Sequence, residues 1–125
     1  MTVAQIVEIL DARLVTGEEL LSKNVNSACG SDLMSDVLAF VKDQSVLVTG
    51  LSNAQTVRTA EMMDIVCIVL VRGKKADEAM TALAQERGIA IMQTHHSMFT
   101  ACGLLYDSGL RGESRKNAAR LKASL

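Results

Sequence analysis

The sequence of 125 residues has no proline and no tryptophan, and its aromatic residues are one tyrosine and two phenylalanines. Proteins that bind single-stranded nucleic acid stack the bases on aromatic side chains, so this composition argues against such a surface. The formal net charge of −1 also lacks the positive excess that contacts with phosphate backbones need. We therefore expect no nucleic-acid partner.

Long apolar runs are absent as well. No segment reaches the roughly 18–20 apolar residues of a membrane-spanning helix, and the first residues lack the basic start and apolar stretch of a signal peptide. The three cysteines, Cys29, Cys67 and Cys102, are scattered and suggest no disulfide framework. We therefore expect a cytoplasmic protein with reduced thiols and no membrane partner.

Helical and strand patterns alternate in the second part of the chain. Strands are expected at 45–50, 65–71 and 89–94, and helices at 31–41, 53–63, 77–87 and 97–108. Residues 65–71 are apolar at every position, which is typical of a central parallel strand buried on both faces. Earlier in the chain we expect a helix at 3–10 and short extended segments at 12–17 and 26–29.

These patterns predict an α/β fold, a three-layer structure in which a mostly parallel sheet of four to five strands has helices on both faces. Thr2 is expected to cap the first helix, and Ser52 or Asn53 the helix at 53–63. We assign residues 1–110 to a single domain. Residues 111–125 hold five basic residues and one acidic residue. They form a basic C-terminal tail or helix, either packed at the terminus or bound to an anionic partner.

Candidate ligand contacts follow from the strand order, because open parallel sheets bind ligands beyond the carboxyl ends of their strands. Four loops fall at that edge, and each precedes a predicted helix whose N-terminus could hold an anion. The residues that we expect to contact a small anionic ligand are Gly30, Ser31, Asp32, Thr49, Gly50, Ser52, Asn53, Arg72, Gly73, Thr94 and His95. The alternative is ordinary turn chemistry.

In two of these loops, charged residues have a second possible role besides the one given above. Asp32 would cap the helix that is expected to begin at Ser31. Arg72, Lys74 and Lys75 cluster after the most apolar strand, either as a solvated basic loop or as phosphate contacts.

Motifs for catalysis and metal binding are missing. The chain has no glycine motif of the NTPase, dinucleotide-binding or serine-hydrolase type. His95 and His96 are adjacent at a strand end and point in opposite directions, so they do not chelate one metal ion. Cys29 precedes a predicted helix, where a thiolate is stabilised, and its alternative is a small buried residue. We assign no catalytic residue and no metal site, and the sequence leaves any cofactor unknown.

Several segments resemble the DRTGG domain family. They include Leu14–Glu19, Cys29–Val37 and Leu104–Leu110. The resemblance covers nearly the whole of residues 3–110, and the chain is similar to small stand-alone members and to the N-terminal domain of HPr kinase/phosphorylase. The Asp-Arg and Thr-Gly-Gly motifs that name the family correspond here to Gly50–Asn53 and Val71–Gly73, each of which keeps one glycine.

The resemblance implies an α/β domain that regulates or oligomerises without known catalysis. Related domains lie beside CBS domains and within long phosphate acetyltransferases, and small members occur near hydrogenase and signalling genes. We therefore expect a non-catalytic regulatory module that binds a small phosphorylated or nucleotide ligand and forms a homodimer. The alternative is an interaction or assembly protein with a protein partner in a redox or signalling complex, and a group-transfer enzyme is less favoured.

Overall fold

The sheet is built around a strand without polar side chains, which is buried along its whole length. The strands are β1 (Arg13–Thr16), β2 (Ser27–Gly30), β3 (Ser45–Thr49), β4 (Ile65–Leu70) and β5 (Ala90–Gln93). Their order in the sheet is β1-β5-β4-β3-β2, with the apolar strand β4 in the centre. Strands β2 to β5 are parallel, and only β1 is antiparallel to its neighbour β5. The predicted α/β fold with a mostly parallel sheet is confirmed.

The structure is a computed structural model that describes residues 1–39, 42–112, 119 and 122–124. Most of the predicted tail at 111–125 lies outside the described residues. Among the residues described, no helix has the length and apolar character needed to cross a membrane.

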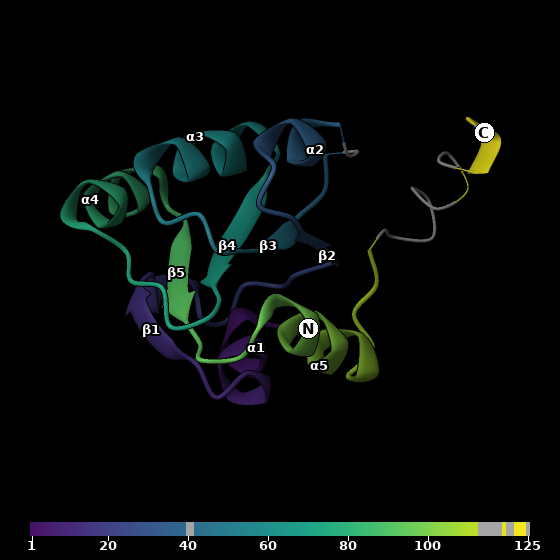
Figure 1. Cartoon of the computed structure of the whole chain (residues 1–125), viewed down its shortest axis with the longest axis horizontal. Helices are drawn as coiled ribbons and strands as arrows, with labels where there is room; N and C mark the ends of the chain where they lie inside the picture. The colour runs from purple at the N-terminus through teal and green to yellow at the C-terminus, as the bar shows by residue number, and fades with distance from the viewer. Residues whose placement is uncertain (40–41, 113–118, 120–121, 125) are drawn as a thin grey trace.

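Helices cover both faces of the sheet (Figure 1). They are α1 (Val3–Ile9), the 3-10 helix η1 (Glu18–Leu20), α2 (Met34–Leu38), α3 (Ala54–Met62), α4 (Glu78–Arg87) and α5 (Met98–Asp107). Helices α1 and α5 lie on one face, and α2, α3 and α4 on the other. Successive strand residues point to opposite faces, so Val46 and Val48 join the core beneath α1 and α5, whereas Leu47 and Ile68 join the core beneath α3 and α4.

Local capping chemistry sets most helix ends. Thr2 and Gln5 form a capping box at the start of α1, as the sequence predicted for Thr2. Of the two predicted caps for α3, Asn53 is the one used, since its side chain accepts a hydrogen bond from the Thr56 amide at 3.0 Å. Gly88 ends α4 in the left-handed conformation, with φ 68°.

The helix predicted at 31–41 begins later than expected, and residues 40–41 lie outside the described part of the chain. Helix α2 starts at Met34, after an extended Leu33 that has no side-chain cap hydrogen bond. The Ser31 hydroxyl accepts the Leu33 amide proton at 3.0 Å, and Asp32 turns toward the end of β3. The predicted capping role of Asp32 is therefore wrong, because its carboxylate is bound to donors distant in the sequence.

The four parallel strands bring their carboxyl ends to one edge of the sheet. The loops after β2, β3, β4 and β5 lead into α2, α3, α4 and α5, respectively. Antiparallel pairing of β1 with β5 places Arg13 opposite Gln93. The first residue of β1 therefore joins the same edge.

Candidate functional site

The predicted ligand contacts separate into three groups. The first, which we call the Asp32 cluster, consists of Asp32, Thr49, Gly50 and Arg72. The second lines a cavity at the end of β5 and comprises Gly73, Thr94 and His95. The third comprises Gly30, Ser31, Ser52 and Asn53, which belong to neither of these groups.

The Asp32 cluster joins the ends of three parallel strands. Asp32 Oδ1 accepts a hydrogen bond from the Gly50 amide at 2.6 Å and one from the Thr49 hydroxyl at 3.0 Å. The other carboxylate oxygen, Oδ2, lies 3.6 Å from Nη2 of Arg72. Both charged side chains are nearly half exposed, so the ion pair itself contributes about 0–1 kcal/mol. The two hydrogen bonds are the firmer attachment.

These contacts favour the ionised form of Asp32. The Gly50 amide makes the largest contribution, and the Thr49 hydroxyl and Arg72 guanidinium act in the same direction, so the pKa of Asp32 lies below its usual value of 3.8. Partial desolvation opposes them. Asp32 is consequently a carboxylate at neutral pH, and it places a full negative charge on the donors at the end of β3.

Arg72 adopts a backbone conformation that is uncommon outside glycine, with φ 57°. Its amide donates to the His96 carbonyl at 2.8 Å, and the Gly73 amide donates to the Thr94 carbonyl at 2.9 Å. The turn aims the guanidinium over Gly50, where a Cβ atom would collide with it. A side chain at position 50 would push the half-exposed Arg72 guanidinium out of this position.

The second group lines an open cavity of about 510 Å³, which we call the β5-end cavity. Its walls come from the start of β1, the loop after β4 and the end of β5. The lining residues are Asp11, Ala12, Arg13, Gly73, Lys75, Gln93, Thr94 and His95. Two permanent cations and one carboxylate thus face the same space, which favours an anionic ligand.

Thr94 is buried and links this cavity to the N-terminal helix. Its hydroxyl donates to the Leu10 carbonyl at 2.9 Å and accepts the His96 amide at 3.3 Å. His95 is exposed and lies against Gly73, where an added Cβ would sit 3.2 Å from its Nδ1 atom. Thr94 therefore shapes the wall, while His95 offers a ring nitrogen at the cavity.

Sequence reasoning missed Asp11, Arg13 and Gln93 as lining residues. Arg13 reaches the cavity only because β1 pairs antiparallel with β5, and no local motif signals that pairing. Lys75 belongs to the basic loop that the sequence singled out, and it is an exposed residue that lines the cavity.

In the third group, Ser31 serves a turn and Asn53 a helix cap. Gly30 faces α5, where an added Cβ would lie 2.8 Å from Cys102 Sγ. Asn53 caps α3, Ser31 shapes the turn before α2, and Ser52 is half-buried before α3. The N-termini of α4 and α5 are likewise capped, by Asp77 and Ser97. The sequence suggested that the free backbone amides at these helix N-termini could bind an anion. In α3, α4 and α5, one of those amides already donates to the side chain of the capping residue.

Cys29 belongs to the buried core on the face of the sheet that α2, α3 and α4 cover. It is buried against α2 and α3, and burial raises the pKa of its thiol to about 11, with smaller contributions from Cys102 and Asp36. Of the two interpretations of Cys29 from the sequence, a small buried residue is the one that the structure supports. Within the described part of the chain, no three His, Cys, Asp or Glu side chains are grouped so that they could hold a metal ion.

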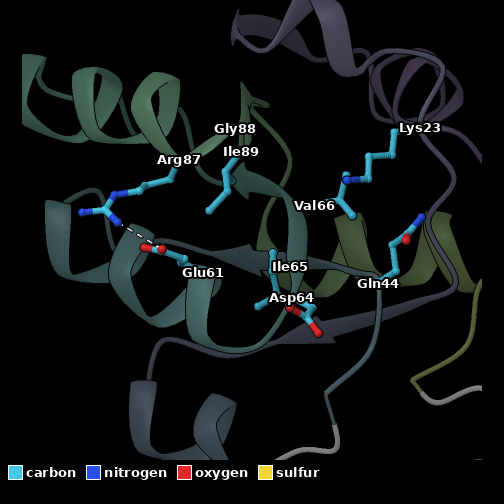
Figure 2. Close-up of a pocket in the computed structure, with 9 residues that line it drawn as sticks. All are labelled: Lys23, Gln44, Glu61, Asp64, Ile65, Val66, Arg87, Gly88 and Ile89. Atoms are coloured by element: carbon cyan, nitrogen blue, oxygen red, sulfur yellow. Dashed lines mark hydrogen bonds and ion pairs between the residues drawn. The ribbon is translucent and has the colours of Figure 1, made fainter.

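A second cavity, of about 370 Å³, lies at the opposite edge of the sheet (Figure 2). On one side Arg87 and Glu61 form an ion pair of 3.1 Å, and Lys23 and Gln44 stand on the other side. Asp64 adds a second carboxylate. Because Arg87 is paired within the wall, this cavity has less positive charge to offer a ligand than the β5-end cavity.

Comparison with known proteins gives a family and a fold. No curated protein matches the chain. A solved structure that is similar contains the CBS and DRTGG domains of the regulatory region of Clostridium perfringens pyrophosphatase, complexed with the activator diadenosine tetraphosphate. Its TM-score is 0.65 at 16% identity, and the match covers 86% of this chain but only 46% of that one.

The likeness at this identity shows the fold, and it agrees with the sheet and helix layers described above. The family model for the DRTGG domain matches residues 5–108. That range begins inside α1 and runs through α5. It therefore includes the whole sheet, with the strand ends that line the two cavities. The chain belongs to the DRTGG domain family.

Proposed function

We propose that this chain is a non-catalytic regulatory module that binds a small phosphorylated or nucleotide ligand in the β5-end cavity. The observation that carries the proposal is the meeting of Arg13 and Lys75 in one cavity with the Thr94–His95 strand end. The cavity volume of about 510 Å³ falls among the roughly 300–1,000 Å³ typical of small-molecule sites. Its position beyond the carboxyl ends of parallel strands is where such sheets bind ligands.

The similar pyrophosphatase regulatory region supports the choice of ligand class, since it is complexed with the activator diadenosine tetraphosphate. Nucleotide polyphosphates are therefore the first compounds to test here. We include a cytoplasmic location in the proposal because Cys29, Cys67 and Cys102 are all free thiols and disulfides are rare in that compartment.

Lys75→Ala is expected to weaken the binding of diadenosine tetraphosphate or ADP about 10-fold, because a charge-assisted contact to phosphate is removed. Isothermal titration calorimetry measures the change. Lys74→Ala is the matched control, since Lys74 is the exposed neighbour that does not line the cavity, and it should bind as the wild type does. Adenosine, which has no phosphate, should not bind measurably.

The proposal fails if the wild type binds none of the phosphorylated compounds. It also fails if Lys75→Ala and Lys74→Ala both bind as tightly as the wild type, because the ligand would then sit elsewhere. A loss in both variants would indicate a diffuse electrostatic attraction, which raising the salt concentration would abolish.

We further propose that the chain forms a homodimer through helix α5. Phe99 and Tyr106 are 88% and 58% exposed on one helix face, two turns apart. Gly103 lies between them with no atom within 4 Å of a Cβ added there. Arg111 packs over the Tyr106 ring at 3.9 Å. A second copy of α5, related by a two-fold axis at Gly103, would set Phe99 of each copy against Tyr106 of the other.

Phe99→Asp is expected to convert a dimer to a monomer, because it places a charge against the Tyr106 ring of the other copy in this apolar contact. Sedimentation velocity gives the mass directly. Met62→Asp is the control, since Met62 is 57% exposed on α3, on the other face of the sheet. A wild-type monomer, or a dimer that survives Phe99→Asp but not Met62→Asp, contradicts the α5 interface.

A further inference from the structure

The Asp32 carboxylate is surrounded by hydrogen-bond donors and a cation that together suit an anion. Its Oδ1 atom receives hydrogen bonds from the Gly50 amide at 2.6 Å and the Thr49 hydroxyl at 3.0 Å, and the Arg72 guanidinium stands 3.6 Å from Oδ2. A backbone amide, a hydroxyl and a guanidinium are the same groups that bind phosphate oxygens in proteins. The carboxylate of Asp32 therefore stands where a ligand oxyanion would be held.

Two of the donors, Thr49 and Gly50, are buried at the end of β3, whereas the acceptor comes from an exposed loop. Thr49 is the last residue of β3 and is fully buried, and its carbonyl accepts the Val71 amide at 3.0 Å. Gly50 is also buried. Asp32 lies between β2 and the short helix α2, and its side chain is 44% exposed. Rotation of the Asp32 side chain would consequently free the donors without a change in the sheet.

Arg72 connects these donors to the β5-end cavity. It precedes Gly73, which lines that cavity. Two backbone hydrogen bonds hold the turn, from Arg72 to His96 and from Gly73 to Thr94. The positive φ of Arg72 is a conformation that residues with a side chain adopt only at a cost, so the two hydrogen bonds hold the turn against an intrinsic preference. The turn directs the guanidinium toward Gly50.

We propose that the Gly50 amide, the Thr49 hydroxyl and the Arg72 guanidinium form an oxyanion subsite, and that the Asp32 carboxylate is an internal anion which a phosphate group of the ligand displaces. The anionic character of the ligand rests on the proposed function. Asp32 thus competes with the ligand and lowers its affinity. A variant without the Asp32 charge binds phosphate groups more tightly than the wild type.

The test uses inorganic pyrophosphate as the probe, with the wild type, Asp32→Asn and Asp36→Asn at one ionic strength. Amide NMR signals report where the probe binds. Asp32→Asn is expected to bind pyrophosphate about 10-fold more tightly than the wild type, with the Gly50 signal among those that move, because a like charge at contact distance is removed. Asp36→Asn removes a carboxylate one turn further on in α2 and should bind as the wild type does.

A second neutral variant, Asp32→Ser, must show the same gain, and Arg72→Ala added to Asp32→Asn must abolish it. Amide spectra of the free variants verify that each is folded. Equal affinity of the wild type and Asp32→Asn, with signals moving at Lys75 and His95 but not at Gly50, overturns the subsite and leaves the proposed function standing. Movement at Gly50 alone supports the subsite and counts against the β5-end cavity. No response in any variant overturns both.

Discussion

Ile68→Ala is expected to lower the free energy of unfolding by about 4 kcal/mol, the largest loss that we predict for a single substitution. Ile68 is fully buried in the central strand β4 and faces α3 and α4. It pairs in register with Leu47 on β3 and Ile91 on β5. The sheet hydrogen bonds hold these neighbours in place, so they cannot close the cavity that the missing atoms leave.

Urea denaturation measures this loss as a lower midpoint at an unchanged slope. Ile68→Val is the matched control, because it removes one methyl group and should cost about 1 kcal/mol. If both variants lost the same small amount, the packing around Ile68 would be looser than the structure shows. Because domains of this size have about 5–15 kcal/mol of stability in total, the alanine variant is expected to be much less stable at 37 °C.

Gly17→Ala is expected to cost about 3 kcal/mol, from two separate causes. Gly17 follows β1 with φ 100°, a conformation that costs a residue with a side chain about 1–2 kcal/mol. In addition, the new Cβ would lie 2.6 Å from Cα and Cβ of Ala90. Ala90 is part of β5 and fully buried, so relief requires a shift of the strand, at a cost of about 1–3 kcal/mol.

Gly109→Ala separates the two causes, since Gly109 has nearly the same φ, 108°, and no atom within 4 Å of an added Cβ. It should cost only about 1–2 kcal/mol, through the backbone conformation alone. Thermal or urea unfolding of both variants gives the difference. Equal losses in the two variants would show that β1 moves away from Ala90 without cost, which would contradict a firm junction between β1 and β5.

That junction matters for the site, because β1 carries Arg13 to the β5-end cavity. Where β1 ends, the absence of a side chain at Gly17 permits the close approach to Ala90. The composition of residues 12–17 indicated a short extended segment and nothing about its partner. Pairing partners are set by contacts between distant residues, and a four-residue strand has too few side chains to specify one by pattern.

Prediction succeeded where the signal was local. The apolar run at 65–71 became the central strand β4 (Ile65–Leu70), because a segment without polar side chains must be buried on both faces. Thr2 and Gly88 marked helix ends, since their side chain or backbone freedom satisfies groups within one turn.

Prediction failed at Asp32, where local and distant partners compete. Capping the next helix would use an amide two or three residues away, and the sequence pattern favours that bond. The Gly50 amide and the Thr49 hydroxyl bind the carboxylate instead. The parallel pairing of β2 with β3 brings their ends together, and residues 18 positions apart in the chain thereby become neighbours.

The sequence by itself determined the order of the elements, the parallel character of the sheet and the edge at which polar loops gather, because periodicity and capping depend on nearby residues. Only the tertiary structure decided which loop residues meet. It grouped Arg13 and Lys75 in one cavity and set Asp32 on the donors at the end of β3. Strand pairing and side-chain rotation create these contacts, and the energies that select them arise between residues far apart in the chain.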